Sequence, residues 1–152
     1  MGLFCTLLLL SWGNDDTEQL IKILGEYDVP ATFFVVGAWV DKYPESVKQL
    51  SDAGHQIQNH SNTHPYMTGL STEQMIDELE SCNKKIENIT GKKPILFRPP
   101  YGDYDNRVIE AVESIDMYTI QWDCDVSHTV GKVHRYRGFR NLKLLKDDTD
   151  ES

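Results

Sequence analysis

The sequence has few cysteines, little positive charge and no long hydrophobic run, and each shortage excludes a class of protein. Its three cysteines form no closely spaced pair, which argues against a disulfide framework or a structural zinc site. A formal net charge of -9 disfavours nucleic acid and anionic lipid as partners. The apolar run at residues 3–10 is too short to span a bilayer as a helix. It also lacks the basic start and the cleavage site of an export signal.

What remains is the composition of one globular domain, with 152 residues, 39% of them hydrophobic and 26% charged. Apolar runs alternate with amphipathic stretches, a pattern typical of parallel βα units. The sequence predicts about five strands, at residues 3–10, 31–36, 56–58, 94–97 and 117–122. Four helices are expected, near residues 15–25, 44–54, 71–91 and 105–114, with Asp15 or Asp16 at the first N-cap.

The predicted organisation is an incomplete α/β domain over residues 1–127 and an irregular or disordered tail over residues 128–152. The tail has no sustained apolar period. About five strands would leave an open sheet, and the last strand would have an unpaired edge that favours self-association.

Two histidines four residues apart, His60 and His64 in the segment HSNTH, follow the third predicted strand. A single helical turn would direct both rings to one side, where they could bind one cation, and zinc suits imidazole ligands. Surface histidines often have this spacing without binding metal. The position after a strand favours a site, because catalytic groups gather at the carboxyl ends of parallel strands.

Two more polar segments also follow predicted strands. In RPPYG, Arg98 is a permanently charged donor that could fix a carboxylate, while two prolines stiffen the chain. The alternative is a rigid turn with a surface arginine. In WDCD, Asp123 and Asp125 would project to the same side and could receive Arg98 or lie near a metal. Taken singly, each carboxylate is more often simply solvated.

The ordered set of ATFFVVG, HSNTH, RPPYG and a strand ending in WDCD resembles the polysaccharide deacetylase family. This is the NodB-homology domain of carbohydrate esterase family 4, and the resemblance covers about residues 12–125. It implies a distorted, TIM-barrel-like (β/α) barrel, here only partial. It also implies a hydrolase that removes acetyl groups from chitin-like or peptidoglycan N-acetyl sugars, with a divalent metal, usually zinc.

The resemblance also assigns roles to individual residues. His60 and His64 would be the metal ligands, and Arg98 would orient the catalytic carboxylate. The backbone N–H of Tyr101 would help to hold the oxyanion. The substrate groove would be lined by Pro99, Pro100, Tyr101 and Trp122. Relatives of this kind usually act outside the cell or at the cell envelope.

The sequence departs from the family at both ends. The general base position falls on Leu9 and a neighbouring ligand position on Leu10, and neither can take a proton or bind metal. Asp15 or Asp16 could substitute, although helix capping is their more common role. No Leu-His motif supplies the general acid, so the sequence is expected to be a truncated or frame-disrupted form. The alternatives are therefore a catalytically impaired fragment that only binds metal or glycan, and a remnant without a stable fold.

Overall fold

The computed structural model describes residues 6–10, 16–122 and 142–145, and its strands form one six-stranded sheet in sequence order. The first five strands run parallel to their neighbours, and the sixth is antiparallel to the fifth. Their bounds are β1 Thr6–Leu10, β2 Ala31–Val35, β3 Gln56–Asn59, β4 Leu96–Phe97, β5 Tyr118–Trp122 and β6 Leu142–Leu145. The α/β fold with about five parallel strands is therefore confirmed.

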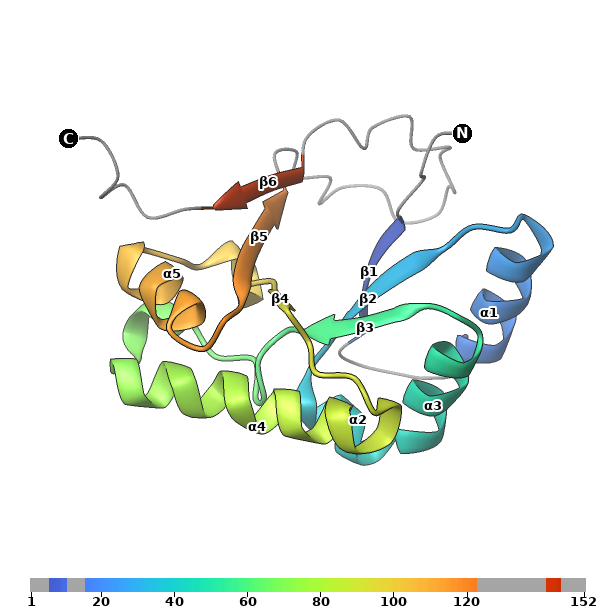
Figure 1. Cartoon of the computed structure of the whole chain (residues 1–152), viewed down its shortest axis with the longest axis horizontal. Coiled ribbons are helices and arrows are strands. Elements are labelled where there is room, and N and C mark those ends of the chain that lie inside the picture. Colours follow the sequence, from blue (N-terminus) through green and yellow to red (C-terminus); the bar gives the residue numbers. More distant parts are fainter. Residues whose placement is uncertain (1–5, 11–15, 123–141, 146–152) are drawn as a thin grey trace.

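The helices lie together on one side of the strands (Figure 1). They are α1 Thr17–Glu26, α2 Gly37–Lys42, α3 Pro44–Asp52, α4 Thr72–Thr90 and α5 Asn106–Glu113, with short 3-10 helices η1 Met67–Gly69 and η2 Pro100–Gly102. Helices outside a curved parallel sheet are the arrangement of a (β/α) barrel wall. Within the part of the chain that the structure describes, no helix is long and apolar enough to cross a membrane.

Local chemistry sets the ends of the helices. Ser71 caps α4 through a capping box with Gln74, and Gly91 ends that helix in the left-handed conformation at φ 72°. Asp105 caps α5 by accepting the N–H of Val108 at 3.1 Å. At α1 the N-cap is Asp16, but its side chain makes no capping hydrogen bond.

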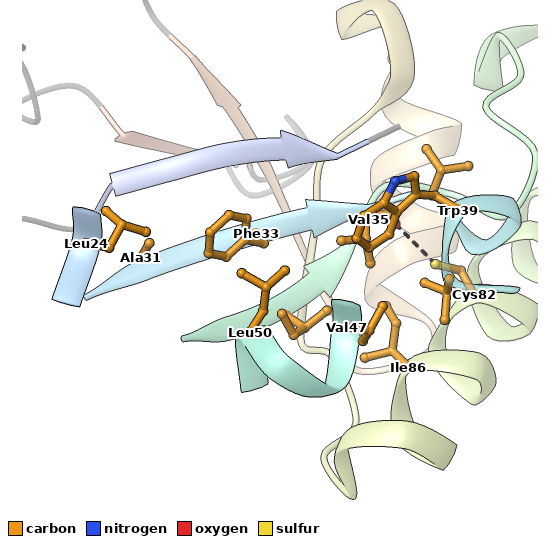
Figure 2. Close-up of a cluster of buried hydrophobic side chains, with 12 residues drawn as sticks. Leu24, Ala31, Phe33, Val35, Trp39, Val47, Leu50, Cys82 and Ile86 are labelled. Atoms are coloured by element: carbon orange, nitrogen blue, oxygen red, sulfur yellow. Dashed lines mark hydrogen bonds between the residues drawn. The ribbon is translucent and has the colours of Figure 1, made fainter. Parts of the chain in front are cut away.

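A hydrophobic core fills the space between the first strands and helices α1 to α4 (Figure 2). Strand β2 is buried along its whole length, as its continuous β-branched and aromatic run predicts. Cys82 of α4 packs into this core, where its thiol lies 3.5 Å from the carbonyl oxygen of Val35. Burial raises the pKa of Cys82 to about 12, so this thiol stays protonated and unreactive.

The strand register places the last residues of the first four strands side by side. This row consists of Leu10, Val35, Asn59 and Phe97, and it continues to Thr119, the second residue of β5. Segments that follow this row therefore meet at one edge of the sheet. The HSNTH and RPPYG segments are two of them.

The structure differs from the sequence-based expectation in three places. Helix α2 was not predicted, because the apolar run of β2 continues into it at Val36 and Gly37 without a polar break. Residues 142–145, placed in the expected irregular tail, form β6 instead. Since β6 pairs with β5, the predicted unpaired edge at β5 is wrong, and a four-residue strand is too short to show a period. Residues 123–141 and 146–152 lie outside the described residues, so the rest of the tail prediction does too.

Candidate active site

The loop at residues 60–64 brings its two histidines together. The ring centroids of His60 and His64 lie 4.9 Å apart, with the ring planes at 73°. The backbone is not the helical turn that the spacing suggested, because Ser61 and His64 adopt left-handed φ angles of 67° and 65°. The two rings are therefore neighbours although the backbone between them is irregular.

His60 is the more enclosed of the two, with 3% of its surface exposed. Its Nδ1 atom lies 2.7 Å from the carbonyl oxygen of Arg98. A carbonyl only accepts, so Nδ1 carries the proton and Nε2 holds the lone pair that a metal requires. Burial lowers the pKa of His60 to about 4, and partial burial also lowers the pKa of His64. At neutral pH His60 is therefore the neutral imidazole that binds metals.

Asn59, which the sequence analysis did not single out, connects this loop to helix α4. Its side-chain oxygen accepts the N–H of Ser61 at 2.7 Å, and its amide donates to the carbonyl of Leu79 and the side chain of Asn83, both at 2.8 Å. The residue is fully buried. An Asn directly before a His at a strand end was the only sequence signal for this role.

The RPPYG segment faces the histidines from the next strand. The ring of Tyr101 lies 4.7 Å from that of His64 and stacks on Tyr66 at 4.2 Å, with the planes at 13°. Tyr66 and Tyr101 are each 61% exposed, so they present a flat aromatic surface beside the histidines. Tyr101 also has a left-handed φ of 58°. The sequence analysis did not find Tyr66, because a single tyrosine after His-Pro carries no pattern.

The other predicted site residues lie around this cluster in different ways. Pro99 and Pro100 are buried. Arg98 is half-buried, and its N–H donates to the carbonyl of Asn59 at 3.0 Å. Trp122 is the last residue of β5.

This cluster contains two side chains that could bind a metal, His60 and His64. Within residues 6–10, 16–122 and 142–145, no group of three His, Cys, Asp or Glu side chains could hold a metal ion. Leu9 and Leu10 end β1, opposite Phe34 and Val35 of β2. The imidazoles suit a divalent metal, while these leucines supply no further ligand and no base. Asp15, Asp123 and Asp125 lie outside the described residues.

The family profile for polysaccharide deacetylases matches residues 10–120, which is well over half of the chain. The chain belongs to the polysaccharide deacetylase family. The resemblance seen in the motifs is thereby confirmed. The profile spans the strand row, both histidines and the tyrosine pair.

Several known proteins resemble this polysaccharide deacetylase domain. The peptidoglycan-N-acetylmuramic acid deacetylase PdaA of Bacillus subtilis is 35% identical over 129 residues, covering 81% of this chain and 49% of the relative. Chitin deacetylase 2 of Cryptococcus neoformans is 37% identical over 123 residues, covering 76% of this chain and 27% of the relative. The chain thus spans less than half the length of these two relatives.

Among solved structures, wild-type BA3943 from Bacillus anthracis, a family 4 carbohydrate esterase pseudoenzyme, superposes with a TM-score of 0.75. It is 36% identical, and the match covers 79% of this chain and 43% of that one. Polysaccharide deacetylases are hydrolases that are generally metal-dependent. The polysaccharide deacetylase domain described here therefore has structural neighbours whose names include both a peptidoglycan deacetylase and a pseudoenzyme.

Proposed function

We propose that this domain is a metal-dependent hydrolase that removes acetyl groups from chitin-like or peptidoglycan N-acetyl sugars. The observation that carries the proposal is the His60 and His64 pair, with ring centroids 4.9 Å apart and Nδ1 of His60 fixed on Arg98. Relatives named peptidoglycan and chitin deacetylases support the substrate class. Such glycans are found outside the cell, so we also propose an extracellular or cell-envelope location.

The two imidazoles would hold the metal, and zinc is the cation that suits them best. A divalent cation held there would supply the chemistry of acidifying water and polarising an acetyl carbonyl. Arg98 keeps His60 in the required tautomer through its carbonyl oxygen. The backbone N–H of Tyr101 would donate to the oxygen that becomes negative during attack, which is the role of an oxyanion-hole donor.

The exposed pair Tyr66 and Tyr101 would bind the sugar. A sugar ring has an apolar face that packs on an aromatic face, and these two rings offer such a surface next to His64. The rigid backbone of Pro99 and Pro100, which directly precede it, would hold Tyr101 in place. An acetyl group on a sugar stacked there would lie close to the histidine pair. Trp122, the last residue of β5, would be a further contact for the sugar, as the family resemblance implies.

A second candidate function is glycan or metal binding without hydrolysis, and Leu9 and Leu10 favour it. The missing general base alone reduces a rate by about 100 to 10,000-fold. The resemblance to a pseudoenzyme fits this candidate as well. A mutant of that pseudoenzyme is described as having restored enzymatic activity, so in that relative the fold remained competent for the chemistry.

Acetate release separates the two candidates. Acetylated chitooligosaccharide or peptidoglycan fragments would be incubated with the zinc-loaded protein and with a His60→Ala variant. Zinc-dependent acetate above the level of the variant supports the hydrolase. Calorimetric binding of zinc or oligosaccharide without acetate supports the binding function. The absence of both acetate and binding would contradict both candidates.

A further inference from the structure

Glu78 of helix α4 makes three hydrogen bonds to the loop that carries the histidines. One carboxylate oxygen accepts the backbone N–H groups of Asn62 and Thr63, both at 2.8 Å. The other accepts the hydroxyl of Thr63 at 2.7 Å. Hydrogen bonds to a charged acceptor are roughly twice as strong as neutral ones. This single side chain therefore satisfies two main-chain donors of a loop that has no regular partner for them.

The loop needs such support because its backbone is strained. Ser61 and His64 both have left-handed φ angles, which cost of order 1 kcal/mol or more for each non-glycine residue. Conformations of this kind persist only where the surrounding contacts determine them. Within the loop, the Ser61 hydroxyl accepts the N–H of His64 at 3.0 Å. Further contacts come from Asn59 of β3 and from neighbouring helices.

Helix α2 and Lys85 also make hydrogen bonds to this loop. The N–H groups of Gly37 and Ala38 donate to the carbonyls of Ser61 and Asn62, each at 2.9 Å. Lys85 of α4 donates to the side-chain oxygen of Asn62 at 2.8 Å. In these hydrogen bonds, α2 and Lys85 donate to oxygen atoms of the loop. Glu78 does the reverse and accepts the N–H groups of the loop.

We infer that Glu78 is a positioning residue that keeps the rings of His60 and His64 side by side, acting through Asn62 and Thr63. The geometry itself does not depend on a metal, whereas its consequence for metal binding rests on the proposed function. An Ala at position 78 would remove both carboxylate oxygens, so the N–H groups of Asn62 and Thr63 would lose this acceptor. Outer-shell partners of metal ligands typically change metal affinity by about 10 to 100-fold.

The test compares Glu78→Ala with Glu80→Ala, which removes an exposed carboxylate of the same charge from the same helix. Both variants and the wild type would be measured metal-free by NMR. We expect contacts between the ring protons of His60 and His64 in the wild type and in E80A, and their loss in E78A. Amide exchange at Asn62 and Thr63 should be about tenfold faster or more in E78A. If E78A keeps the ring contacts and slow exchange, the inference is wrong.

Zinc titration then separates this inference from the proposed function. A weaker zinc affinity in E78A than in E80A, by about 10 to 100-fold, supports both. If the wild type binds no zinc while E78A still loses the ring contacts, the inference stands and the metal function fails. If E78A binds zinc as E80A does, the inference fails and the function stands. Should E78A not fold, Glu78→Gln keeps the shape of the side chain but makes its hydrogen bonds neutral and weaker, and unchanged amide exchange at residues 62 and 63 would then overturn the inference.

Discussion

The Nδ1 atom of His60 lies 2.7 Å from the carbonyl oxygen of Arg98, which joins two motifs that are 38 residues apart. The contact follows from strand pairing. Asn59 of β3 lies opposite Phe97 of β4, and His60 and Arg98 are the residues that directly follow them. The same bond sets the tautomer of the imidazole. Pairing of neighbouring strands therefore positions His60 without the help of a ligand.

Burial of His60 makes stability depend on pH. Its pKa falls from 6.5 to about 4 on folding, so below pH 6.5 the unfolded chain takes up a proton that the folded chain resists. The free energy of unfolding should fall as pH drops from about 6.5 towards 4, by up to about 3 kcal/mol from this residue. Urea unfolding with a chelator present would measure the loss. A His60→Gln variant with the same pH slope would contradict the assignment.

Restoring a carboxylate at position 9 should restore turnover. Leu9 is 42% exposed, so an aspartate there costs little burial energy. Zinc-dependent acetate release by Leu9→Asp should exceed that of the wild type by about 100 to 10,000-fold. The matched control is Leu9→Asn, which has the same size but cannot take the proton. Equal rates for both variants would count against the missing-base explanation.

A side chain at position 37 should disturb the histidine loop. A Cβ atom on Gly37 would collide with the side chain of Asn62 and lie 3.1 Å from its Cα. Gly37→Ala should therefore lower the free energy of unfolding by about 1 to 3 kcal/mol and weaken zinc binding. Gly25 of α1 has nothing within 4 Å, so Gly25→Ala should instead add up to about 1 kcal/mol. The free energy of unfolding would be measured by urea unfolding. A change of the same sign in both variants would contradict this prediction.

The stacked tyrosines should contribute to glycan affinity. Tyr66→Ala removes one exposed face of the pair, and affinity for a chitooligosaccharide should fall by roughly 3 to 10-fold, as expected for an aromatic contact of about 1 kcal/mol. Stability should change little because the side chain is largely exposed. Tyr27, which is 74% exposed at the end of α1, gives the control variant Tyr27→Ala. The same loss of calorimetric affinity in both variants would show that the effect is not specific to the pair.

Most of the fold was predictable because its signals are local. The run at β2, the capping box at Ser71 and the terminal Gly91 each fix an element through neighbouring residues. Helix α2 had no such signal, since no polar residue separates it from β2. Strand β6 depends on pairing with β5, a distant partner that no short segment can reveal.

The candidate site was predictable to the extent that motifs mark it. His60, His64 and Tyr101 could be found because they lie in short segments after strands, and the structure places their rings in contact. Asn59 and Glu78 could not, because their importance lies in hydrogen bonds to residues that are adjacent only in space. Supporting residues of this kind become visible only when the fold is known.

Zinc titration into the metal-free protein, followed by calorimetry, tests the central claim most directly. We predict one zinc per chain for the wild type and for His55→Gln, whose ring lies at the opposite end of the strands and accepts the N–H of Ala31. Binding should be lost in His60→Ala and in His64→Ala. A wild type that ignores zinc, or a double variant of His60 and His64 that binds it equally well, would contradict the account.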